Sequence, residues 1–150
     1  MSRILIVDEQ PVARHALRML VEAEDHQVVG EAGNGLDALQ LARSQPADLM
    51  ILELAIPRLG GLEVIQRLAS QPAGPKILVL TGQDSEYFAL RCLEAGAAGF
   101  VSKQENLQPM LYPTALLLTA ILIVVGLGTY QRLSADVEQK VEAKDKAKRN

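Results

Sequence analysis

Met50-Ile-Leu-Glu-Leu-Ala-Ile-Pro-Arg-Leu-Gly-Gly61 is the stretch that decides the fold. It begins as an apolar run typical of a buried strand and reaches a carboxylate at Glu53. Pro57 and the Gly60-Gly61 pair then turn the chain into a segment with helical spacing of its apolar residues. In open α/β sheets, functional groups lie at the carboxyl ends of parallel strands, and Glu53 occupies such an end.

Other strand-like runs also end in polar side chains. The segment Ile4-Leu5-Ile6-Val7 is followed by two acids, the segment Ile77-Leu78-Val79-Leu80 by a hydroxyl, and the segment Gly99-Phe100-Val101-Ser102 by an ammonium group. These polar residues are, in order, Asp8, Glu9, Thr81 and Lys103. If the strands are parallel neighbours, the sequence predicts that these groups and Glu53 converge on one crevice.

Strands and helices are predicted to alternate strictly along the chain. A short β-branched strand at 27–31 completes a set of five, and apolar positions at helical spacing fill each interval between strands. Right-handed crossovers then give a doubly wound parallel sheet with helices on both faces. We therefore predict an α/β fold with a flavodoxin-like five-stranded sheet, whose first and third strands bring Asp8, Glu9 and Glu53 together.

The composition argues against several functional classes. Residues 1–105 carry nine Lys and Arg against fourteen Asp and Glu residues, which is not the basic surface that nucleic-acid binding requires. The single cysteine, Cys92, rules out an internal disulfide and fits a reducing compartment. The N-terminus reads as a buried strand rather than as a signal peptide.

The four strand-end motifs, in this order and spacing, resemble the receiver domain of bacterial response regulators. The resemblance covers roughly residues 1–107, and Val-Val-Gly-Glu-Ala-Gly-Asn-Gly at 28–35 is similar to receivers that precede a helix-turn-helix DNA-binding domain. It implies that the position of Glu53 accepts a phosphoryl group from a histidine kinase. It further implies Mg²⁺ ligands at Asp8, Glu9 and the carbonyl of Ala55, phosphoryl contacts at Thr81 and Lys103, and a switch aromatic at Phe100.

Glu53 departs from the family pattern, which has aspartate at this position. The extra methylene moves the carboxylate by about a bond length, and a misplacement of ~1 Å can slow a reaction on the order of 100-fold. We expect a receiver that phosphorylation does not switch, with residual phosphorylation of Glu53 or an inert degenerate site as alternatives. Glu9 also leaves the Mg²⁺ geometry open, so weak binding of Mg²⁺ or none is expected.

The chain leaves the family pattern after Lys103. No charged residue occurs between Glu105 and Arg132, and about 20 apolar residues suffice to span a bilayer. Tyr112 and Tyr130 bracket this run about 27 Å apart at the helical rise, a separation that fits the two membrane interfaces. We predict a transmembrane helix at 108–131; the alternative is an apolar fifth helix buried against the receiver or in a dimer.

The remaining segment, 132–150, is expected to be a charged tail. Its basic residues favour an inside position by the positive-inside rule, but that would place the receiver outside the cell. We expect the receiver in the cytoplasm, anchored in the bacterial inner membrane by one span.

Three functions remain open at this stage. The first is a membrane-anchored pseudo-receiver that acts in phosphorelay-type signalling as a phosphorylation-independent regulatory or docking module. The second is a structural accessory subunit of a membrane protein complex, and the third is a conventional phosphoaccepting response regulator. The expected partners are the membrane, a signalling protein or membrane-complex subunits, and a histidine kinase. No helix-turn-helix follows, so we expect neither nucleic-acid binding nor enzymatic activity.

Overall fold

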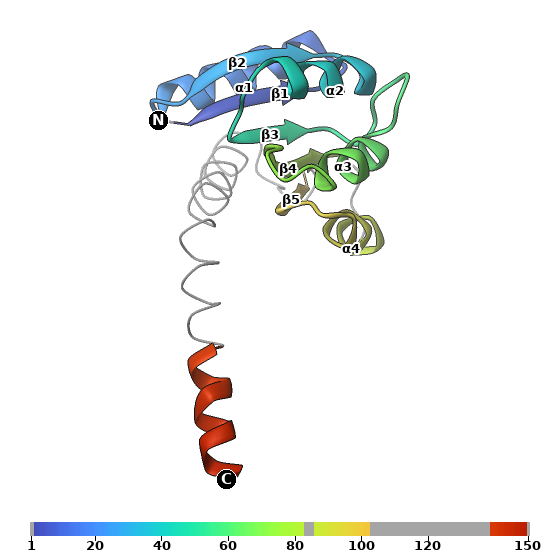
Figure 1. Cartoon of the computed structure of the whole chain (residues 1–150). Coiled ribbons are helices and arrows are strands. Elements are labelled where there is room, and N and C mark those ends of the chain that lie inside the picture. Colours follow the sequence, from blue (N-terminus) through green and yellow to red (C-terminus); the bar gives the residue numbers. More distant parts are fainter. Residues whose placement is uncertain (1, 83–85, 103–138, 150) are drawn as a thin grey trace.

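The computed structural model describes residues 2–82, 86–102 and 139–149 of the chain. In the first two ranges, strands and helices alternate as predicted (Figure 1). In chain order the elements are β1 (Arg3–Val7), α1 (Pro11–Ala23), β2 (Gln27–Ala32), α2 (Gly35–Ser44), β3 (Leu49–Leu52), α3 (Gly61–Ala69), β4 (Lys76–Thr81), α4 (Glu86–Ala95) and β5 (Gly99–Ser102).

The five strands form one parallel sheet in the order β2-β1-β3-β4-β5. This order confirms the predicted flavodoxin-like topology, in which β1 and β3 are neighbours at the switch point. Val7 pairs with Leu52, and Leu52 pairs with Val79, so these three strands end at nearly the same level. The residues that follow them therefore meet at one edge of the sheet.

Helices pack on both faces of the sheet, as the unbroken apolar strands predict. Successive residues of β1 alternate between two hydrophobic clusters, with Leu5 and Val7 in one and Ile4 and Ile6 in the other. The first cluster contains buried residues of α2, α3 and α4, whereas the second contains those of α1. Helix α1 thus packs on one face of the sheet, and α2, α3 and α4 pack on the opposite face.

Local sequence signals explain where the helices begin and end. Asn34 caps α2, because its side-chain oxygen accepts a hydrogen bond of 2.9 Å from the amide of Asp37. Pro11 occupies the first turn of α1, where its missing N–H costs nothing. Gly96 follows α4 with a φ of 115°, a conformation that glycine adopts without strain.

The predicted transmembrane helix at 108–131 lies outside the described residues. Within the described ranges, none of the helices combines the length and the apolar character needed to cross a bilayer. In the predicted tail, residues 139–149 are helical, and all of them are exposed.

Candidate functional site

The carboxyl edge of the sheet positions two acidic residues side by side. The amide of Glu53 donates to the carbonyl of Val7 at 2.9 Å, and the amide of Asp8 donates to the carbonyl of Ala32 at 3.0 Å. These bonds continue the pattern of the sheet one residue beyond β1 and β3. Asp8 and Glu53 are both buried, with 4% and 9% of their surface exposed, so both residues are largely shielded from solvent.

In the described part of the chain, the Thr81 hydroxyl and the Ala55 amide contact the carboxylate of Glu53. The hydroxyl of Thr81, at the end of β4, donates to Glu53 Oε1 at 2.5 Å. The backbone amide of Ala55 donates to the same oxygen at 3.2 Å. Thr81 is fully buried, and a hydrogen bond to an ionised oxygen is both shorter and stronger than one between neutral groups. The structure thus brings together Glu53 and Thr81 as predicted, and it joins them through a direct contact.

The loop after β1 is organised around Asp8 and Arg14. Asp8 Oδ1 accepts a hydrogen bond of 2.9 Å from the amide of Gln10. Arg14, on α1, donates from Nη1 to the carbonyl oxygens of Asp8 and Glu9, at 2.6 and 3.3 Å. The other side of the Arg14 guanidinium pairs with Glu31 of β2, with 3.5 Å between Nε and Oε1. Arg14 therefore ties the acidic loop to both α1 and β2.

Sequence reasoning missed the role of Arg14. Its position six residues after Asp8 places it one turn into α1, facing back toward the loop, but an arginine on a helix surface usually lies in solvent. Arg14 and Arg18 lie four residues apart, a helical spacing, and Glu31 is an acid on the neighbouring strand. This pattern was the signal in the sequence for the role of Arg14.

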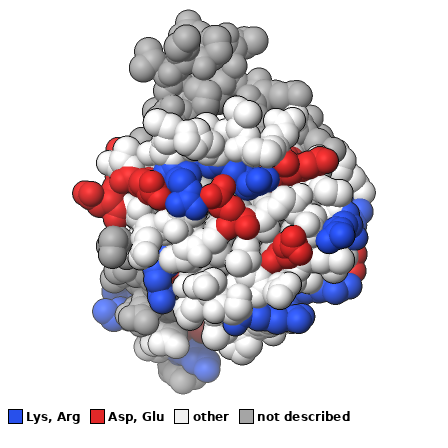
Figure 2. All heavy atoms as spheres, turned by 90° about the horizontal axis from the view of Figure 1, so that it is seen from above, with Lys and Arg blue, Asp and Glu red and all other residues white. Residues whose placement is uncertain are grey.

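Glu31 also pairs with Arg18, whose Nη2 lies 2.6 Å from Glu31 Oε2. Arg18 makes a second pair with Glu22 at 3.0 Å, and its hydrogen bond to Glu31 raises its pKa above the ordinary value for arginine. Seen from above, the molecule shows acidic and basic side chains next to one another (Figure 2). This face is therefore a mixed surface that carries charges of both signs.

Of the three predicted carboxylates, Asp8 and Glu53 are buried at the edge of the sheet, whereas the side chain of Glu9 is exposed. Among the described residues, no three histidine, cysteine, aspartate or glutamate side chains form a group that could hold a metal ion. Glu53 turns toward Thr81 and the amide of Ala55, and the Glu9 side chain is exposed. The ligand types at Asp8, Glu9 and the carbonyl of Ala55 still suit a hard cation, because all of them are oxygens. That set stays a prediction.

Three further residues were predicted to belong to the site, namely Phe100, Ala55 and Lys103. Phe100 lies on β5, partly buried against the core shared with α2, α3 and α4. Ala55 is exposed at the start of the loop between β3 and α3. Lys103 lies outside the described residues, so its predicted contact with a phosphoryl group stays a prediction.

Comparison with known proteins identifies the family. The pattern of the response regulator receiver domain matches residues 4–112. A putative transcriptional regulator of Pseudomonas aeruginosa is 54% identical over 111 residues, which are 74% of this chain and 54% of that protein. The virulence-factor transcription regulator BvgA of Bordetella pertussis is 49% identical over 110 residues, or 73% of this chain and 53% of that protein. This chain thus spans about half the length of the curated relatives it matches.

Solved structures agree with the sequence relatives. A two-component response regulator of the LuxR family from Aurantimonas superimposes with a TM-score of 0.75 at 31% identity, covering 84% of this chain and 86% of that one. The receiver domain of the putative regulator NarL from Mycobacterium tuberculosis gives 0.68 at 26% identity, covering 79% of this chain and 95% of that one. Sequence, sheet order and acidic edge therefore agree, and the chain belongs to the response regulator receiver domain family of two-component signalling.

Proposed function

We propose that this receiver works without a phosphorylation switch, because the carboxylate of Glu53 already occupies the place of the phosphoryl group. The observation that carries this proposal is the pair of hydrogen bonds to one oxygen, Glu53 Oε1, from the Thr81 hydroxyl and the Ala55 amide. A hydroxyl and a backbone amide aimed at one oxygen are the kind of donors that stabilise a transferred phosphoryl group. The longer side chain of glutamate carries an anion to these donors without any transfer.

The contacts of Glu53 also favour this proposal over an inert site. In the described part of the chain, every buried side-chain nitrogen or oxygen has a hydrogen-bond partner. A degenerate site kept only for packing would tolerate an apolar residue here, whereas a buried carboxylate costs free energy unless it is bonded. The 2.5 Å bond joins β3 to β4 at the edge of the sheet and favours one arrangement of Thr81.

The same geometry disfavours Glu53 as an acceptor. Attack on a phosphodonor requires a carboxylate oxygen aligned with the reacting phosphorus. One extra methylene moves that oxygen by about a bond length, and a misplacement of ~1 Å can slow a reaction on the order of 100-fold. To attack a phosphodonor, Glu53 Oε1 would also have to give up its hydrogen bonds from the Thr81 hydroxyl and the Ala55 amide. If Mg²⁺ binds, Asp8, Glu9 and the carbonyl of Ala55 would hold it, and it would supply charge neutralisation at this edge.

Intact-protein mass spectrometry tests this proposal. The full chain is incubated with acetyl phosphate and Mg²⁺, and we expect no phosphorylated species because the acceptor oxygen is misplaced and already bonded. A homologous receiver with aspartate at this position, treated in parallel, shows that the donor is active. A stable adduct that disappears in Glu53→Gln would contradict the proposal.

The membrane anchor is proposed on a separate observation. Residues 106–131 contain no charged side chain, which would be unusual for a helix that lies on the surface of a soluble domain. In this arrangement the receiver would act at the inner face of the bacterial membrane and recruit signalling proteins or membrane-complex subunits through protein contacts. Its output would then be a docking event rather than DNA binding.

Fractionation of cells that express the full chain tests the anchor. We expect the protein in the membrane pellet, resistant to alkaline carbonate and released by detergent, because an apolar span of this length partitions into lipid. The matched control ends at residue 105 and should stay in the supernatant. Release of the full chain by carbonate alone would contradict the anchor without affecting the proposal for Glu53.

A further inference from the structure

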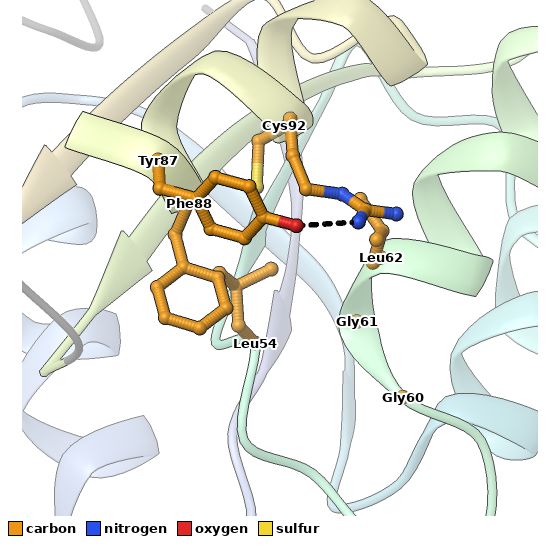
Figure 3. Close-up of a pocket in the computed structure, with 8 residues that line it drawn as sticks. Leu54, Gly60, Gly61, Leu62, Tyr87, Phe88 and Cys92 are labelled. Atoms are coloured by element: carbon orange, nitrogen blue, oxygen red, sulfur yellow. Dashed lines mark hydrogen bonds between the residues drawn. The ribbon is translucent and has the colours of Figure 1, made fainter. Parts of the chain in front are cut away.

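A cavity of about 400 Å³ is lined by residues of α3, of α4 and of the loop that precedes α3 (Figure 3). Its volume falls within the range of small-molecule sites. The apolar part of its wall comes from Leu54, Leu62, Phe88 and Cys92. Cys92 is fully buried, which raises the pKa of its thiol, so it adds an uncharged surface at neutral pH.

Arg91 and Tyr87 supply the polar part of the same wall. Arg91 Nη1 donates to the Tyr87 hydroxyl at 2.9 Å, and the guanidinium carbon lies 5.6 Å from the centre of the Tyr87 ring. In Figure 3 the hydroxyl of Tyr87, on α4, points toward Leu62 on α3. Within the described ranges, none of the ion pairs includes Arg91. A guanidinium has five N–H donors, so several remain for a bound anion.

We infer that this cavity binds a small amphipathic carboxylate. The apolar body would lie against Leu54, Leu62 and Phe88, and the carboxylate would accept hydrogen bonds from Arg91. The chemistry of the lining supports this ligand class. A cavity with apolar walls and one cationic side chain favours a ligand that combines an apolar body with one negative charge. Arginine suits this task, since its planar fork binds both oxygens of a carboxylate.

The cavity is connected to the edge of the sheet through the backbone. Leu54 follows Glu53 directly, and its carbonyl accepts hydrogen bonds from the amides of Ile56 and Gly61, at 3.0 and 3.1 Å. A Cβ added to Gly61 would lie 2.7 Å from the Cα of Leu54, so the segment has little freedom to move independently. A ligand pressed against Leu54 would therefore shift the segment that also carries the Ala55 amide. This regulatory step rests on the proposed function, whereas binding itself does not.

Fluorine NMR of 3-(4-fluorophenyl)propanoate with the full chain tests the inference. The matched neutral probe is 3-(4-fluorophenyl)propanamide, and a titration without protein gives the baseline. We expect saturable binding of the acid, about tenfold tighter than that of the amide, because only the acid makes a charge-assisted bond with Arg91. Absence of saturable binding, or equal affinity for the two probes, would overturn the inference.

Three variants locate the binding. In Arg91→Gln the acid should lose its advantage over the amide, whereas Arg43→Gln, on the exposed surface of α2, should behave as the unchanged chain. Leu62→Trp should weaken both probes, since the larger side chain fills the cavity. Thermal unfolding shows that each variant is folded. If the acid binds equally well to Arg91→Gln or to folded Leu62→Trp, the site lies elsewhere and the inference is wrong.

Amide NMR separates the regulatory step from the binding. With the acid bound, the amide signals of Glu53 and Ala55 should shift, and in Leu62→Trp they should not. Binding without these shifts would overturn the regulatory step alone. The proposal for Glu53 depends on the phosphodonor experiment and would stand or fall independently.

Discussion

Glu53→Asp is expected to convert this chain into a phosphoacceptor. With acetyl phosphate and Mg²⁺, the variant should accumulate at least ~100-fold more phosphorylated protein than the unchanged chain over the same interval. Intact-mass spectra of both proteins at matched times give the ratio. The effect is large because shortening the side chain changes two things together, namely the position of the acceptor oxygen and its bonding.

The first change is geometric. The amide of Glu53 is bonded to the carbonyl of Val7, so we expect its backbone to stay in place when the side chain is shortened. The aspartate carboxylate would withdraw by about one bond length from Thr81, which now donates at 2.5 Å. The second change follows from the first, because the space left beside the Thr81 hydroxyl and the Ala55 amide can accept a phosphoryl oxygen instead.

Two controls make the result specific. Glu53→Gln keeps the size of the side chain but removes the nucleophile, and it should give no adduct. Combining Glu53→Asp with Asp8→Asn should reduce the adduct strongly, because Asp8 is the buried carboxylate beside Glu53 at the edge of the sheet and a predicted metal ligand. If Glu53→Asp stays unmodified while a homologous receiver is labelled, the barrier lies elsewhere in the site and the methylene is not its cause.

The fold could be predicted from the sequence because its signals are local and repeated. Each strand is a short apolar run, and each ends at a turn or a polar residue that fixes the boundary. The stretch around Glu53 is a clear case, since Gly60-Gly61 marks the start of α3 at the residue where the structure begins it. Parallel pairing and the short connections then restrict the order of the strands.

The details of the site depend on side-chain choices that no local pattern encodes. The sequence places Asp8, Glu9 and Glu53 at one edge, but it does not reveal that the Glu53 carboxylate accepts a hydrogen bond from Thr81 or that the Glu9 side chain is exposed. The same applies to Arg14, whose bonds to the carbonyls of the loop require the register between α1, β1 and β2. The cavity between α3 and α4 depends on how two helices pack, and periodicity gives no information about such gaps.

The last prediction concerns the junction between α2 and the loop that carries the site. Gly35, the first residue of α2, is buried, and a Cβ at this position would lie 2.1 Å from the carbonyl oxygen of Leu59 and 2.7 Å from its Cβ. The amide of Gly35 also donates to the carbonyl of Pro57 at 3.2 Å. Because backbone atoms on both sides fix this approach, Gly35→Ala should reduce the free energy of unfolding by about 3 kcal/mol.

Gly60→Ala is the matched control for Gly35→Ala. Gly60 precedes α3 with a φ of −67°, which any residue adopts, and nothing lies within 4 Å of its added Cβ. Its effect should stay within about 0.5 kcal/mol, so urea denaturation followed by circular dichroism should separate the two variants clearly. If both variants unfold at the same urea concentration, the backbone at Gly35 and Leu59 can move apart with little loss in the free energy of unfolding. The loop between β3 and α3 would then be too compliant to hold the Ala55 amide against Glu53, and the proposed locked site would lose its structural basis.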